Sequence, residues 1–390
     1  MTTHTSRATI RELVATLVQI ETENPPGNER ACSEFILDWF DDHDIDADAI
    51  IEPDPDRPQV GVRIGDDEPT LVLNGHIDVV PAGDRDNWSY DPYGGTVDGT
   101  RLYGRGSADM KSGVAIGMLA TVRLAQAIRD GDLGGSIVFH AAMGEETAEP
   151  GTKTLLDAGY DGTYGVVLEP TGMRTATAEK GLAWYEITVS GEPSHASHPD
   201  QGDNAVYNAR PILDAIEEYD ATVRDRTDDL LGRAYATVTE VKAGTKENVV
   251  PGTTTITVDR RFLPDEQVSA IDQEIETMLT EATVGTDVEA TWRRTRTYES
   301  AAIDPASHLA AVFRRQSAAV ADVPTEPWGI AASTDVRNFV NDAGMEAITW
   351  GPAELSQAHT YDEHVDLAAI EDGLEALVAA SRELLGGDDV

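Results

Sequence analysis

Residues 110–142 read MKSGVAIGMLATVRLAQAIRDGDLGGSIVFHAA, a long helical pattern with small residues on one side followed by a short apolar strand. Another apolar strand, PTLVLNG at 69–75, precedes this stretch, and YGVVLEP at 164–170 follows it. The helical pattern GTKTLLDAGY at 151–160 separates the last two strands. Strands that alternate with helices in this way predict an α/β fold, with a mostly parallel sheet flanked by helices.

The rhythm changes between residues 181 and 294. Alternating strands and amphipathic helices occur there in the order β-α-β-β-α-β, which is that of a ferredoxin-like sandwich. The α/β rhythm resumes after about residue 295. We therefore expect a larger domain formed by residues 1–180 and 295–390, with a ferredoxin-like α+β domain of residues 181–294 inserted into it. A chain of 390 residues is long enough for two cores.

Acidic residues dominate the charge of the chain. Asp and Glu total 71 against 29 Lys and Arg, which gives a net charge of −42, and the acids are spread over all segments. This distribution suggests a halophilic protein, since molar salt shortens the screening length to about 3 Å. An acidic cation-storage or scaffold protein is a competing interpretation, but it does not explain the motifs below. The same charge argues against nucleic acid or an anionic membrane as a partner.

The location is expected to be cytoplasmic, in a high-salt cell interior. No apolar run approaches the roughly 20 residues of a membrane-spanning helix. The start, MTTHTSRATIRELV, lacks the apolar centre of a signal peptide. The single cysteine, Cys32, excludes an intrachain disulfide and a cysteine-based metal cluster.

Carboxylates and imidazoles follow the predicted strands. They are His76 and Asp78 in LVLNGHIDVVP, Asp109 in LYGRGSADMKSG, Glu145 and Glu146 in AAMGEETAEP, Glu169 in VVLEPTG, and His359 in AHTYDEHV. In an open parallel sheet, ligands gather at the carboxyl ends of the strands. Each residue alone has an ordinary explanation, such as a helix cap for Asp109 or a solvated turn for Glu169. Two sheltered, adjacent glutamates nevertheless require positive charge nearby, and two divalent metals that share a bridging carboxylate would supply it.

Six motifs resemble, in order and spacing, one large family. They are GHIDVVP (75–81), GRGSADMKSG (104–113), GEE (144–146), EPT (169–171), GEPSHASHPDQGDNAV (191–206) and AHTYDEHV (358–365). The family contains acetylornithine deacetylase, succinyl-diaminopimelate desuccinylase, aminoacylase and the glutamate-releasing carboxypeptidases. The resemblance runs from about residue 10 to the C-terminus and implies a zinc-exopeptidase-like fold for the larger domain.

The resemblance also implies two zinc ions per chain, with Co²⁺ as an alternative, bridged by Asp109. His76 and Glu169 would complete one site, and Glu146 and His359 the other. Three protein ligands per ion leave a coordination position open, as catalytic zinc requires. Of the remaining acids, Glu145 would be the general base and Asp78 would hydrogen-bond His76.

The inserted domain carries further candidates. By resemblance, His195 stabilises the tetrahedral oxyanion and commonly reaches into the partner subunit's site, which implies a homodimer through this domain; His198 is the alternative. Asn248 and Arg261 resemble positions that hold the substrate carboxylate. Arg260 is the alternative to Arg261, because strand alternation places only one of the two on the right face. An ordinary polar sheet surface remains the competing interpretation.

The expected activity is hydrolysis of the amide bond of an N-acyl amino acid or short peptide with a free carboxylate. Glu169, where aminopeptidase relatives tend to carry Asp, favours a deacylase of amino-acid metabolism or a carboxypeptidase. Two alternatives remain: a dipeptidase or carboxypeptidase of the same family, and an inactive relative that binds peptides or amino acids. Two departures from the family pattern are Ser112, where many relatives have glycine, and GIAASTDVRNF at 329–339, which leaves the substrate open.

Overall fold

The computed structural model describes residues 7–386 and divides into two compact units. The first unit contains the described residues up to Thr177, together with Ala302–Gly329 and the described residues from Thr334 onward. The second unit contains Ala178–Ala301 and Ile330–Ser333. The boundaries predicted from the sequence, 181 and 294, lie inside those of the second unit, and 330–333 was assigned to the larger domain. The start of the segment used for the signal-peptide expectation lies outside the described residues.

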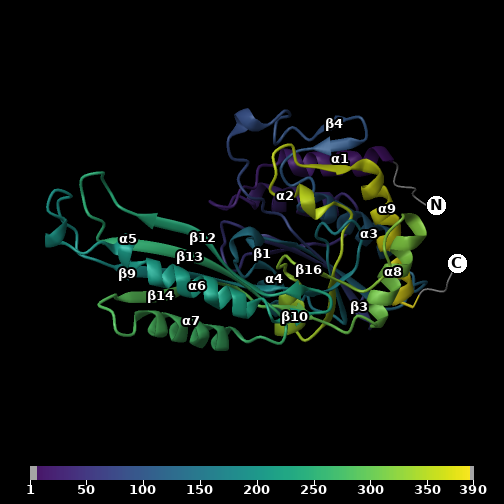
Figure 1. Cartoon of the computed structure of the whole chain (residues 1–390). Helices are drawn as coiled ribbons and strands as arrows, with labels where there is room; N and C mark the ends of the chain where they lie inside the picture. Colours follow the sequence, from purple (N-terminus) through teal and green to yellow (C-terminus); the bar gives the residue numbers. More distant parts are fainter. Residues whose placement is uncertain (1–6, 387–390) are drawn as a thin grey trace. The chain divides into compact units, whose positions relative to one another are not determined.

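The first unit is built on a large mixed sheet (Figure 1), in which the strand order is β1-β2-β6-β3-β7-β17-β8-β15 and β16 pairs with β8. The strands are β1 (Asp48–Ile50), β2 (Gln59–Ile64), β3 (Thr70–His76), β6 (Ser136–Ala142), β7 (Tyr164–Val167), β8 (Ala176–Glu179), β15 (Ala301–Ala302), β16 (Trp328–Ile330) and β17 (Glu346–Thr349). The central strands β6, β3, β7 and β17 are parallel, whereas β1 and β2 on one side and β8 on the other join antiparallel. The predicted α/β fold is confirmed.

Helices flank this sheet. They are α1 (Arg7–Gln19), α2 (Arg30–Asp41), α3 (Lys111–Arg129), α4 (Gly151–Asp157), α8 (His308–Val320) and α9 (Leu367–Leu384). Helix α3 contacts β3 and β6 on one side and α1 and α9 on the other, so it is buried along most of its length. This explains its small residues. A Cβ on Gly113 would lie 2.1 Å from the carbonyl oxygen of Leu168, so only glycine lets the start of α3 approach the end of β7.

A small three-stranded sheet brings two distant motifs together. It has the order β18-β5-β4, with β4 at Thr96–Asp98, β5 at Arg101–Tyr103 and β18 at His364–Asp366. Its pairing continues into a hydrogen bond from the amide of Gly104 to the carbonyl of Glu363, 2.9 Å long. The segment that carries His359 therefore lies beside the turn that carries Asp109.

The second unit has the strand order β12-β13-β9-β14, and all its pairs are antiparallel. Its main elements are β9 (Gly181–Ser190), α5 (Ala205–Asn208), α6 (Arg210–Val223), β12 (Tyr235–Ala243), β13 (Thr253–Phe262), α7 (Val268–Thr283) and β14 (Ala290–Tyr298), with a short hairpin of β10 (Thr227–Asp228) and β11 (Gly232–Arg233). Helices α6 and α7 pack side by side against the sheet (Figure 1). This is the ferredoxin-like order. Among the described helices, none combines the length and apolar character needed to cross a membrane.

Candidate metal centre

The candidate ligands come together in the first unit because neighbouring parallel strands end at one edge of the sheet. His76 is the last residue of β3, Glu145 and Glu146 follow β6, and Glu169 follows β7. Strand β3 lies between β6 and β7, so these three strand ends are adjacent. Asp109 precedes α3, which packs on β3, and His359 lies in the loop after β17 with a left-handed backbone (φ 61°).

Asp109 lies between two histidines. Its Oδ1 is 3.2 Å from Nε2 of His76, and its Oδ2 is 3.3 Å from Nε2 of His359. On the first side, Oε1 of Glu169 is 3.5 Å from the same nitrogen of His76. On the second side, Oε2 of Glu146 is 3.2 Å from Nε2 of His359. The five side chains thus form two clusters that share Asp109, with the same membership that the sequence resemblance implies.

The ring of His76 has a defined tautomer. Its Nδ1 lies 2.9 Å from the main-chain oxygen of Asp78, and a carbonyl oxygen can only accept, so Nδ1 carries the hydrogen. In the neutral ring, the lone pair of Nε2 then faces carboxylate oxygens of Asp109 and Glu169. That contact is repulsive unless a proton or a cation lies between the atoms. The orientation is the one that metal-binding histidines adopt.

The centre contains more buried carboxylates than cationic side chains that could balance them. Burial raises the pKa of Glu145 well above its ordinary value and also raises the pKa of Glu146. Burial, followed by the charge of Asp109, raises the pKa of Glu169 to about 8. One oxygen of Glu146, Oε1, is buried without a hydrogen-bond partner. These carboxylates are therefore either protonated or balanced by a cation.

The pKa values of the histidines shift in the opposite direction. Burial would lower the pKa of His76, but hydrogen bonds that its ring donates to the surrounding carboxylates raise this pKa well above its ordinary value. Hydrogen bonds to Asp109 and Glu146 raise the pKa of His359 to about 10. Each cluster offers one imidazole and one carboxylate of its own, and the two clusters share the carboxylate of Asp109. These ligands fit two zinc-like divalent ions in place of the protons.

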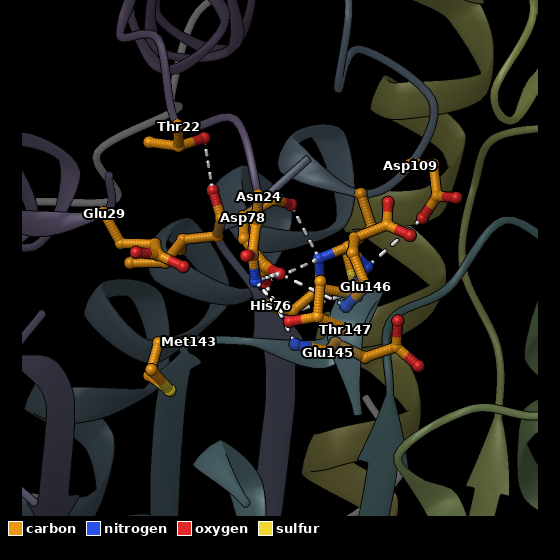
Figure 2. A network of polar contacts seen from close by, with 12 residues as sticks. Thr22, Asn24, Glu29, His76, Asp78, Asp109, Met143, Glu145, Glu146 and Thr147 are labelled. Atoms are coloured by element: carbon orange, nitrogen blue, oxygen red, sulfur yellow. Dashed lines mark hydrogen bonds and ion pairs between the residues drawn. The ribbon is translucent and has the colours of Figure 1, made fainter. Parts of the chain in front are cut away.

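Asp78 holds the turn that carries the two glutamates (Figure 2). Its Oδ1 accepts the backbone N–H of Glu145 at 3.2 Å, and its Oδ2 accepts that of Glu146 at 3.1 Å. Its contact with His76 is made by the main-chain carbonyl, while the carboxylate oxygen lies 3.6 Å from Nδ1. The Nδ2 amide of Asn24 donates to Oδ2 at 2.9 Å. Asn24 was missed in the sequence, although ENPPG at 23–27 is a conspicuous turn signal.

Two further groups near the centre were not identified from the sequence. Nη1 of Arg337 lies 4.0 Å from Oε1 of Glu145, and its Nη2 donates to Asp335 at 3.3 Å. Glu363 accepts the backbone N–H of Ala108 at 2.9 Å and that of Asp109 at 3.1 Å. Both lie in segments that the sequence motifs contain, STDVR at 333–337 and HTYDE at 359–363.

His195 and Asn248 lie on neighbouring segments of the second unit. The amide of Ala196 donates to the carbonyl of Asn248 at 3.0 Å, and His195 pairs with Val249 in an isolated bridge. His195 and His198 both contact the hydroxyl of one serine, Ser197, through Nδ1 at 2.7 and 2.9 Å. The contacts of the two histidines therefore do not separate the alternatives.

The two candidate arginines lie on opposite faces of β13. Arg260 is fully buried under the helices, where it donates to Tyr219 at 3.2 Å and pairs with Glu266. The side chain of Arg261 is 31% exposed on the other face and pairs with Asp259 at 2.8 Å. This favours Arg261 as the residue able to reach a ligand. Arg261 lies eight positions from the start of β13, about 27 Å in an extended strand, and Asn248 precedes that start.

Comparisons with known proteins agree with this geometry. The family model described as Peptidase family M20/M25/M40 matches residues 72–383. A Staphylococcus aureus protein (strain MSSA476) named probable succinyl-diaminopimelate desuccinylase is 27% identical over 397 residues, covering 94% of this chain and 95% of the relative.

Solved structures share the fold. An M20 family metallo-carboxypeptidase from Sulfolobus solfataricus has a TM-score of 0.78 at 15% identity, covering 96% of this chain and 98% of the other. A dinuclear metal-binding M20 peptidase from Bacillus subtilis has a TM-score of 0.72 at 16% identity, covering 97% and 98%. Because the family match extends from before His76 to beyond His359 and takes in the second unit, this chain is a hydrolase-family protein that belongs to peptidase family M20/M25/M40.

Proposed function

We propose that this protein is a dizinc amidohydrolase that cleaves the amide bond of an N-acyl amino acid or short peptide with a free carboxylate. A substrate like that of succinyl-diaminopimelate desuccinylase is favoured by the relatives, which match at only about 27% identity. The observation that carries the proposal is the position of Glu145. It is a buried carboxylate with an oxygen within 4.8 Å of ligand atoms of His76 and Glu169, and its Oε1 lies 4.0 Å from Nη1 of Arg337.

In the proposed reaction, His76, Asp109 and Glu169 would hold one ion, and Asp109, Glu146 and His359 the other. The bound ions would supply Lewis-acid activation of water and of the scissile carbonyl. Glu145 takes the proton that the attacking water loses and delivers it to the leaving amine nitrogen. Burial keeps bulk water away from its carboxylate and raises its pKa, which suits a group that must hold a proton between two steps. Asp78 fixes the main chain of this base. His195 would donate a hydrogen bond to the negative oxygen that forms at the carbonyl carbon.

The free carboxylate of the substrate is assigned to Arg261, with Asn248 as the second candidate. Because the strand between them spans about 27 Å, the two residues of one chain do not meet at a single carboxylate. A homodimer formed through the second unit would allow residues of two chains to serve one site. The same arrangement would let His195 act on the partner's substrate.

The substrate class is tested with a panel of amides. Because the acid excess favours a halophilic protein, it is purified in molar KCl, loaded with Zn²⁺ or Co²⁺ and assayed on N-succinyl-diaminopimelate, N-acetylornithine, acyl-glutamates and dipeptides. We expect turnover of at least one acylated amino acid and a loss of about 10²- to 10⁴-fold in Glu145→Gln, which keeps every candidate ligand. Absence of turnover, or equal activity in Glu145→Gln, would overturn the proposal. Two metal equivalents per chain without turnover would favour the binding-protein alternative.

The dimer is tested by complementation. The variants Glu145→Gln and His195→Ala are each inactive if both groups are needed. If His195 acts across the interface, a heterodimer of the two contains one complete site, so random mixing restores about a quarter of the wild-type activity. An inactive mixture of chains that light scattering shows to be dimeric would place His195 in its own chain's site.

A further inference from the structure

A buried ion pair lies behind the candidate centre, outside the groups assigned so far. The guanidinium of Arg57 donates through Nε and Nη2 to both oxygens of Glu29, at 2.7 and 2.6 Å. Its remaining terminal nitrogen, Nη1, donates to Oε2 of Glu149 at 2.6 Å. The side chains of Arg57 and Glu29 are 11% and 0% exposed. One planar fork thus joins two carboxylates that lie far apart in the sequence.

The second carboxylate leads directly to the catalytic turn. The other oxygen of Glu149, Oε1, accepts the hydroxyl of Thr147 at 2.7 Å and the Nδ2 amide of Asn24 at 3.4 Å. The same amide group donates to Thr147 Oγ1 at 2.7 Å and to Oδ2 of Asp78 at 2.9 Å. Figure 2 shows Asn24, Asp78 and Thr147 of this group around the turn. Asp78 in turn accepts the backbone amides of Glu145 and Glu146. The contacts therefore form a continuous chain from Arg57 to the candidate base and ligand.

The backbone of the turn needs such restraint. Glu145–Thr147 form one short 3-10 turn between two left-handed residues, Gly144 at φ 77° and Ala148 at φ 62°. A left-handed alanine is unfavourable by itself, so surrounding contacts must maintain it. The amide of Glu149 closes the turn on the carbonyl of Gly144 at 2.8 Å. Glu149 therefore fixes the far end of the turn, as Asp78 fixes the near end.

We propose that Arg57 is a positioning residue for the candidate base Glu145 and ligand Glu146, which it acts on through Glu149. The proposal rests on the proposed function, because it takes the turn to carry the base. A guanidinium suits this task, since its rigid fork orients two carboxylates at once, whereas the single ammonium of lysine does not. Buried ion pairs are weak contributors to stability but can specify one geometry. Arg57 therefore acts mainly on the placement of the turn.

The test uses Arg57→Lys and Glu149→Gln, with Arg30→Lys as the matched control. Arg30 is 47% exposed and pairs with Asp56 at 3.4 Å, in the same part of the chain. We expect kcat to fall about 10- to 100-fold in both test variants, with KM within about twofold, because the substrate contacts are untouched while the base is displaced. Binding of one of the two zinc equivalents should weaken about tenfold or more, as seen when groups behind metal ligands are removed. Arg30→Lys should match the wild type.

A third measurement separates this proposal from the proposed function. In metal-free protein, hydrogen exchange of a peptide covering residues 143–150 should accelerate at least tenfold in Glu149→Gln, while peptides of β3 and β6 keep wild-type protection. If the wild type turns over no substrate but this change occurs, the positioning role stands and the assigned reaction fails. Wild-type kcat, zinc binding and exchange in Glu149→Gln would overturn the positioning role. Should Arg57→Lys fail to fold, Glu149→Gln decides, since that side chain is 31% exposed and tolerates an amide.

Discussion

Replacement of Asp78 by asparagine is the most informative single change at the centre. The side chain is fully buried, and the amide has nearly the same shape, so packing is preserved. The carboxylate accepts three donors: the amide of Glu145 at Oδ1, and the amide of Glu146 and the Nδ2 group of Asn24 at Oδ2. An asparagine has only one acceptor oxygen. In its better orientation the oxygen replaces Oδ2, and the new NH₂ group then faces the N–H of Glu145.

The magnitude follows from these contacts. One charge-assisted hydrogen bond, worth about 1.5–3 kcal/mol, is lost, and a buried N–H left unpaired costs about 1–3 kcal/mol more. We therefore expect the free energy of unfolding of the metal-free protein to fall by about 2.5–6 kcal/mol. The turn will relax away from the misplaced amide, and a shift of about 1 Å in the candidate base costs about 100-fold in kcat.

The assay combines urea unfolding of the metal-free variant, zinc titration by calorimetry and steady-state kinetics in molar KCl. The matched control is Asp56→Asn, the same exchange at a side chain that is 94% exposed. We expect Asp78→Asn to keep KM within about twofold while kcat falls about 100-fold. The reasoning holds that the carboxylate of Asp78 fixes the turn. It would be refuted by an Asp78→Asn protein with kcat and zinc affinity within about threefold of the wild type and a free energy of unfolding within about 0.5 kcal/mol.

Three further outcomes are expected. Burial lowers the pKa of His140 to about 4 from its ordinary 6.5. The unfolded chain therefore binds the extra proton first as pH falls, and the free energy of unfolding drops by up to about 3 kcal/mol between pH 6.5 and 4. Urea titrations should show this component in the wild type but not in His140→Gln. Gly113→Ala places a Cβ 2.1 Å from the carbonyl oxygen of Leu168, so it should cost about 1–3 kcal/mol of stability and weaken zinc binding at Glu169. The control Ser112→Ala removes a hydroxyl that has no hydrogen-bond partner, so calorimetry should show neither change. Removal of metal by a chelator should lower the midpoint of thermal unfolding. Ions that bind only the folded state stabilise it by about 4 kcal/mol when their free concentration is about 1,000 times the dissociation constant. An unchanged midpoint would contradict a metal site among these carboxylates.

The gathering of the ligands could be predicted because it depends on local patterns. A short apolar run identifies a buried strand, and the carboxyl ends of parallel strands meet at one edge whatever the rest of the chain does. His76, Glu146 and Glu169 follow three such runs, in β3, β6 and β7. The division of the ligands between two clusters did not follow from these patterns. It came from resemblance, because no periodicity indicates which carboxylate lies between two histidines.

The role of Asp78 shows where local reasoning ends. The resemblance implies a hydrogen bond between Asp78 and His76, and residues two apart in an extended strand point the same way. Strand β3 ends at His76, however, and the chain beyond it turns so that the carbonyl of Asp78 meets the ring. The carboxylate is thereby free to hold the turn after β6. The alternation of side chains along a strand gives no information about residues beyond its end.

The supporting residues were missed for a related reason. Asn24, Arg57 and Glu149 lie in irregular segments, and each has an ordinary surface explanation when it is considered alone. Their burial arises only when loops from three parts of the chain pack together. The edge strand β1 and its neighbour β2 were missed as well, since strands of three and six residues beside proline-rich turns give little periodicity.

Arginines lie behind the candidate centre and contact its supporting carboxylates. Arg57 contacts Glu149, which leads to the turn of Glu145 and Glu146, and Arg105 pairs with Glu363, which holds the backbone of Asp109. Each guanidinium pairs with a supporting carboxylate rather than with a candidate ligand. A cation in direct contact with those ligands would compete with the metal through the same Coulomb term. Loss of either arginine should therefore disturb the geometry of the centre more than its charge. For this reason the positioning role of the arginines is measured by kinetics and metal affinity and not by stability alone.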